Sequence, residues 1–68
     1  MNISLRDLRL KNDLTQQEVA KIAKITRSYY TLIENDNGRK RTPSVAVVKR
    51  IAKALQFPWE DFYKDDAR

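Results

Sequence analysis

With 68 residues the chain has room for one small domain, of a size that buries only about 60% of its unfolded surface on folding. Neither cysteine nor histidine is present, which excludes disulfides, zinc-thiolate sites and the commonest general base, so no metal site or cofactor is expected. The net charge is +5, and residues 1–59 hold 12 of the 14 cations but only 5 of the 9 anions. This basic excess favours a polyanionic partner, while residues 60–68 form an acidic end.

Nothing in the sequence indicates a leader or a membrane span. The first ten residues already carry Arg6, Asp7 and Arg9, so they lack an apolar stretch of signal-peptide length. No later segment is apolar enough to cross a membrane. We therefore expect a soluble, cytoplasmic protein without membrane contacts, formed by a single domain over residues 1–68.

Apolar residues recur at intervals of three and four, which predicts an all-α fold built as a compact bundle of five short helices. The first covers about residues 3–12, with Leu5 and Leu8 on one face. Because each residue turns a helix by about 100°, Arg9 lies about 40° from Leu5 and also points inward. A buried cation needs a partner, since an uncompensated charge in the core is strongly destabilising.

Two closely spaced N-caps predict a helix-turn-helix. Thr15 and Glu18 form a capping box that begins a helix over about 16–23. Thr26 is a second N-cap that leaves only residues 24–26 between two short helices. The predicted buried face of the first of these helices comprises Val19, Ile22 and Ala23, with the small Ala20 allowing another helix to approach.

The next predicted helix, over about 27–35, has one inward and one outward face. Tyr30 and Ile33 point inward, and Glu34 lies about 40° from Tyr30 and faces inward as well. Arg27 is at the amino end of this helix. The outward side chains are Ser28, Thr31 and Leu32.

A basic loop over residues 35–42 separates this helix from the next one. Ser44 is the predicted N-cap of that next helix, and Pro58 is expected in the first turn of a last one. The cations of the loop are Arg39, Lys40 and Arg41. The helix after Ser44 has an apolar stripe formed by Val48, Ile51, Ala52 and Leu55, and its polar side carries Lys49, Arg50 and Lys53. The last helix has three aromatic residues on one side, Trp59, Phe62 and Tyr63.

Several spaced segments agree at once with the pattern of one known family. They are LTQQEVA at 14–20, ITRS at 25–28, IE at 33–34, PS at 43–44 and IAKAL at 51–55. With these segments the chain resembles the lambda-repressor-like, Cro-type (XRE family) helix-turn-helix DNA-binding proteins over nearly its whole length. The resemblance implies a regulator of transcription that binds double-stranded DNA, a repressor acting as a homodimer on a pseudo-palindromic operator. Its recognition helix, 27–35, would enter the major groove.

The same resemblance implies roles for individual residues. Gln16 matches a residue that contacts phosphate and steadies a recognition side chain, and Arg9 and Glu34 match an ion pair between helices. Lys24 replaces a frequent glycine in the turn, where a left-handed conformation costs about 1 kcal/mol more than with Gly. Predicted base contacts are Arg27, Ser28 and Thr31, and predicted backbone contacts are Gln16, Gln17, Tyr29, Asn37, Arg39, Lys40 and Arg41.

Several of these site residues also have a simpler interpretation. Arg27 could be an ordinary solvated arginine, although an arginine at this end of a groove helix suits guanine O6 and N7. Ser28 and Thr31 could contact phosphate, water or nothing, and Leu32 could meet a thymine methyl. The C-terminal aromatic residues Trp59, Phe62 and Tyr63 are core residues by default, and the competing hypothesis is that some of them, with Leu10, form a two-fold interface.

Two other functional classes compete with DNA binding by a repressor. An antitoxin or adaptor would use the helix-turn-helix domain to bind a protein partner as well, but the acidic pair Asp65 and Asp66 is short for a toxin-wrapping segment. An enzyme is disfavoured, since the sequence contains no nucleophile-base pair or metal cluster and leaves little space for a closed pocket. No small-molecule ligand is evident.

Overall fold

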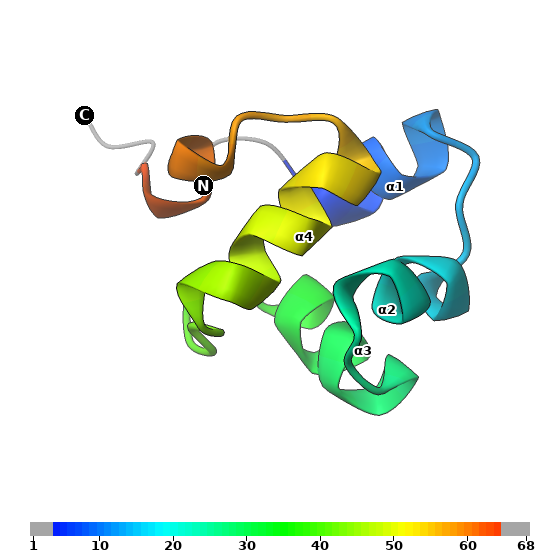
Figure 1. Cartoon of the computed structure of the whole chain (residues 1–68), viewed down its shortest axis with the longest axis horizontal. Coiled ribbons are helices and arrows are strands. Elements are labelled where there is room, and N and C mark those ends of the chain that lie inside the picture. Colours follow the sequence, from blue (N-terminus) through cyan, green and yellow to red (C-terminus); the bar gives the residue numbers. More distant parts are fainter. Residues whose placement is uncertain (1–3, 65–68) are drawn as a thin grey trace.

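The computed structural model describes residues 4–64, which form four α-helices and one short 3-10 helix (Figure 1). The elements are α1 Leu5–Lys11, α2 Gln16–Ala23, α3 Arg27–Asn35, α4 Val45–Leu55 and the 3-10 helix η1 Trp59–Tyr63. The predicted all-α class is confirmed, but the prediction of a fifth α-helix is wrong. The amide of Asp61 bonds the carbonyl of Pro58, three residues back, and Pro58 caps η1 instead of lying in its first turn.

A hydroxyl side chain caps the amino end of every α-helix among the described residues. Thr15 Oγ1 accepts from the amide of Glu18, whose carboxylate in turn accepts from the amide of Thr15 at 2.8 Å, so the predicted capping box is confirmed. Ser4 has the same role for α1, which therefore starts at Leu5, two residues later than predicted. The four caps are Ser4, Thr15, Thr26 and Ser44.

The hydrophobic core lies where α4 crosses the helix-turn-helix. Figure 1 shows α4 through the middle of the molecule, with α2 and α3 on one side and η1 on the other. Each of the four α-helices contributes fully buried side chains, and η1 adds Phe62, which is 4% exposed. The largest fully buried side chains are Tyr30, Leu5, Ile33, Ile51, Leu55, Val19 and Val48. Within residues 4–64 no helix is long and apolar enough to span a membrane.

The prediction that Ile22 is buried is wrong. Its side chain is 44% exposed, whereas Val19, Ala20 and Ala23 are fully buried. On a helical wheel Ile22 lies about 160° from Ala20. Because the small Ala20 faces the other helices, Ile22 is turned toward the surface.

The turn between α2 and α3 is tight because Lys24 adopts the left-handed conformation, with φ of 61° and ψ of 42°. The amide of Ile25 then reaches back to the carbonyl of Ala20 at 3.0 Å. From α4, Arg50 Nε donates to the carbonyl of Ala23 at 2.8 Å and satisfies another group at the end of α2. This arginine was expected only on the polar side of its helix.

The loop between α3 and α4 packs against η1 through Gly38 and Phe62. Gly38 has φ of +76°, and a Cβ added to it would lie 2.5 Å from Cζ of Phe62. Glycine is therefore required both by the backbone conformation and by the space available. Phe62 is 4% exposed and belongs to the core.

We expect Gly38→Ala to lower the free energy of unfolding by about 2 to 3 kcal/mol, because the new methyl group collides with the Phe62 ring at a left-handed residue. Urea titration followed by circular dichroism measures this change. Thr42→Ala, an exposed position in the same loop, is the control and should change stability by less than about 0.5 kcal/mol. Equal stability of the two variants would contradict close packing at Gly38.

Candidate functional site

Three helices meet at one buried carboxylate, that of Glu34 in α3. Arg9 of α1 donates from Nε to Glu34 Oε1 at 2.8 Å and from Nη2 to Oε2 at 3.3 Å, so the pair is bidentate. Gln16, the first residue of α2, donates from Nε2 to Glu34 Oε2 at 2.9 Å, and the Tyr30 hydroxyl donates to Oε1 at 2.9 Å. The structure thus has the Arg9–Glu34 pair that the sequence predicted, with the two side chains 12% and 4% exposed.

Burial alone would raise the pKa of the Glu34 carboxyl. Hydrogen bonds from Arg9, Gln16 and Tyr30 outweigh that effect and hold the pKa of Glu34 below its ordinary value. The same hydrogen bond to Glu34 raises the pKa of Arg9, while burial and the nearby carboxylate raise the pKa of Tyr30 well above its usual range. The network therefore holds one fixed negative and one fixed positive charge.

Gln16 connects this buried network to the outer surface of α3. Its amide nitrogen is bound to Glu34, and its amide oxygen accepts from the Thr31 hydroxyl at 3.0 Å. Thr31 is half-buried, so it lies at the boundary between the network and solvent. The sequence predicted a DNA-backbone contact for Gln16 and a base contact for Thr31. In the structure these two side chains are hydrogen-bonded to each other.

The predicted base-contacting residues lie in the first two turns of α3. The N-cap Thr26 accepts from the amide of Tyr29 at 3.1 Å, which fixes the first turn. Arg27 and Ser28 in this turn are exposed, and Tyr29 is half-buried against the core. Leu32 is 42% exposed, as expected for an outward side chain.

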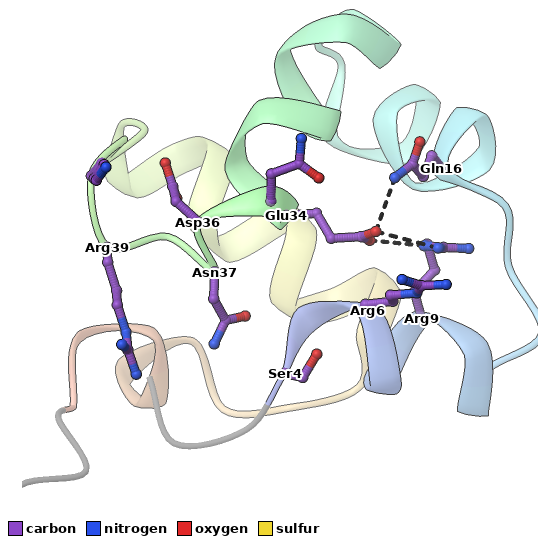
Figure 2. Close-up of a pocket in the computed structure, with 10 residues that line it drawn as sticks. Ser4, Arg6, Arg9, Gln16, Glu34, Asp36, Asn37 and Arg39 are labelled. Atoms are coloured by element: carbon purple, nitrogen blue, oxygen red, sulfur yellow. Dashed lines mark hydrogen bonds and ion pairs between the residues drawn. The ribbon is translucent and has the colours of Figure 1, made fainter.

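A polar cleft lies beside α3, between the first turn of α1, the start of α2 and the basic loop. Figure 2 shows Arg6 and Arg9 from α1 on the Gln16 side of this cleft, with Arg39 across from them. Arg6 is exposed and was not among the predicted site residues, because its sequence position gives no sign that α1 borders the basic loop. The cleft is lined by Ser4, Arg6, Arg9, Gln16, Glu34, Asn35, Asp36, Asn37, Arg39 and Lys40.

The basic loop is held in shape by contacts of its own. Asp36 Oδ1 accepts from the amide of Gly38 at 2.9 Å, and Asp36 Oδ2 accepts from Arg41 Nη1 at 3.2 Å. Asn37, predicted to contact the DNA backbone, uses its Oδ1 to accept from the amide of Leu5 at 2.8 Å. That contact joins the loop to the start of α1, a structural role that the sequence did not reveal.

The C-terminal aromatic residues do not form one exposed patch. Phe62 is in the core, Tyr63 is 45% exposed, and Trp59 is half-buried beneath Lys49, whose Nζ is 4.8 Å from the ring centroid. Phe62 is therefore not available to a second molecule while this fold is intact. Leu10 is on the last turn of α1, and Figure 1 shows that end of α1 on the opposite side of the molecule from η1.

Comparison with known proteins identifies the family. A family model described as helix-turn-helix matches residues 5–62, and the chain belongs to this family, which confirms the resemblance found in its sequence. The chain is 49% identical, over 61 residues, to a Bacillus subtilis (strain 168) protein named "Uncharacterized HTH-type transcriptional regulator YqaF". The match covers 90% of this chain and 76% of that relative. No solved structure gives a significant match.

Acid is expected to weaken the fold through Glu34. Because the native pKa of Glu34 is lowered, its contribution to stability is complete above the ordinary carboxyl pKa of about 4.3 and is lost as the pH falls through the native value. Urea titrations from neutral pH down to about pH 3 should show decreasing stability. Glu34→Gln should flatten this dependence and lower stability at neutral pH by about 3 kcal/mol, since Arg9 keeps its buried charge.

The double replacement Arg9→Met with Glu34→Leu is the control for that experiment. It removes both charges together, so it should be more stable than the single Glu34→Gln variant at neutral pH. An unchanged pH dependence in Glu34→Gln would show that another carboxyl group is responsible.

Proposed function

We propose that this protein is a DNA-binding regulator of transcription whose helix α3 reads bases in the major groove. The observation that carries the proposal is the exposed first turn of α3, with Arg27 and Ser28 at its surface and Thr31 beside them. Helix α3 is anchored by the buried Tyr30 and Ile33 and by the hydrogen bonds to Glu34. The family membership and the name of the Bacillus subtilis relative support the same function.

In this proposal the residues around α3 divide into two groups. Base edges are read by Arg27, Ser28 and Thr31, with Arg27 paired to guanine O6 and N7. The sugar-phosphate backbone is held by a second group of side chains, several of which line the cleft, and these fix the position of the protein without reading sequence. The backbone group comprises Gln16, Gln17, Tyr29, Asn37, Arg39, Lys40 and Arg41, and we add Arg6 because it lines the same cleft.

We further propose that the protein acts as a homodimeric repressor. Two recognition helices about 34 Å apart would read half-sites one helical turn apart, so the operator is a pseudo-palindrome. Occupying such a site blocks access of RNA polymerase. The exposed Tyr63 and the half-buried Trp59 are the aromatic side chains at η1 that remain accessible for a two-fold contact.

Selection from a random duplex library tests the reading function. We expect a symmetric motif, and Arg27→Ala should weaken binding by about 1 to 3 kcal/mol and relax one position in each half-site. Neutralising Arg39, Lys40 and Arg41 should weaken all duplexes alike and reduce the dependence on salt. Lys53→Ala, which removes a cation of α4 outside the cleft, is the charge control; selection of no duplex at all would favour a protein partner instead.

Sedimentation velocity at high micromolar concentration tests the dimer. We expect a dimer of the free protein or two protein chains on each duplex, and Tyr63→Glu should reduce association because it places a charge at the proposed contact. Leu10→Glu, on the opposite side of the molecule, is the matched control. Monomers alone, with and without the selected duplex, would contradict the homodimer.

A further inference from the structure

A chain of hydrogen bonds with one fixed direction runs from the buried ion pair to the surface of α3. Arg9 donates to Glu34, Gln16 Nε2 donates to Glu34 at 2.9 Å, and Thr31 Oγ1 donates to Gln16 Oε1 at 3.0 Å (Figure 2 shows the first two steps). Every donor in this chain points inward, toward the Glu34 carboxylate. The chain ends at a hydroxyl group on the recognition helix.

The charge of Glu34 determines that direction. A carboxylate only accepts hydrogen bonds, so the Gln16 amide must turn its NH₂ group toward Glu34. The oxygen of the same amide then faces Thr31, and because this oxygen carries no hydrogen, the Thr31 hydroxyl must supply one. With its proton committed, the hydroxyl retains only lone pairs for another partner.

Thr31 is placed where such a partner would be found. On the helical wheel it lies about 40° from Arg27 and about 60° from Ser28, between the two exposed residues of the first turn. The side chain is half-buried, with its hydroxyl engaged by Gln16 on the inner side. A partner on the face that carries Arg27 and Ser28 can therefore reach only the remaining lone pairs of the hydroxyl oxygen.

We propose that Thr31 is an acceptor-only base reader, whose hydroxyl oxygen accepts a hydrogen bond from the exocyclic amino group of adenine or cytosine. This inference rests on the proposed binding of α3 in the major groove. There, adenine N6 and cytosine N4 are the donors, whereas guanine O6 and thymine O4 are acceptors. A base that presents an acceptor to Thr31 would face only the lone pairs of the hydroxyl oxygen and could form no hydrogen bond with it. For the same reason Thr31 cannot donate a hydrogen bond to a phosphate oxygen.

The experiment uses the full chain and the duplex obtained by selection. In both half-sites, each adenine is replaced in turn by purine, which lacks N6, and each cytosine by 2-pyrimidinone, which lacks N4. At one position per half-site the loss of the amino group should weaken wild-type binding about five- to tenfold. For the Thr31→Val variant, which keeps the shape of the side chain, the analogue at that position should not change the affinity, whereas analogues at other positions should weaken binding as they do for the wild type. Ser28→Ala is the control on the same face, and its affinity should still fall with the analogue at the Thr31 position.

A second variant tests the direction of the hydrogen-bond chain. Gln16→Met leaves the Thr31 hydroxyl free to donate, so the preference at its position should widen to include bases that present O4 or O6. A purely structural role of Gln16 would lower affinity without changing that preference.

Three results would overturn the inference. If no analogue position depends on Thr31, or if Gln16→Met leaves the base preference at the Thr31-dependent position unchanged, the protein still binds DNA but Thr31 is not an acceptor-only reader. If no duplex is bound with any sequence preference, the proposed function fails and this inference fails with it.

Discussion

The arrangement of the helix-turn-helix depends on the buried Glu34 carboxylate. Removing a charge from water is costly, and Glu34 is stable in its position because Arg9, Gln16 and Tyr30 all donate to it. These donors come from α1, α2 and α3, so the requirement to satisfy one carboxylate constrains three helices at once. Among the described residues no buried side-chain nitrogen or oxygen is left without a hydrogen-bond partner. Apolar packing brings α2 and α3 together, and this network determines how they meet.

A polar network differs from an apolar core in having a direction. Leucine and isoleucine contacts tolerate small changes in orientation, whereas the Gln16 amide has two unlike ends, and reversing it would place its oxygen against the Glu34 carboxylate. The interaction that stabilises the bundle therefore also decides which atom of Gln16 faces Thr31. Gln16 therefore contributes to the stability of the bundle and also decides whether the Thr31 hydroxyl donates or accepts a further hydrogen bond.

The parts of the structure that the sequence predicted well are local. The Thr15 capping box and the inward direction of Arg9 follow from residues within one or two helical turns, and the left-handed Lys24 agrees with the turn position that the family resemblance gave it. The contacts that it did not predict join distant segments: Asn37 Oδ1 bonds the amide of Leu5, and Gly38 lies against Phe62. Helical periodicity places a residue on a face but does not say which other element covers that face. This is also why the prediction that Ile22 is buried is wrong.

Long-range and local contacts together hold the basic loop in one conformation. Its length and its single glycine suggest a flexible segment, yet it is fixed by Asp36 from within, by Asn37 to α1 and by Gly38 to η1. A flexible cation loses conformational freedom when it binds an anion, and a loop that is already ordered loses less. The C-terminal η1 therefore has an indirect part in the proposed phosphate contacts: by packing Phe62 over Gly38 it helps to hold the loop backbone from which those cations extend.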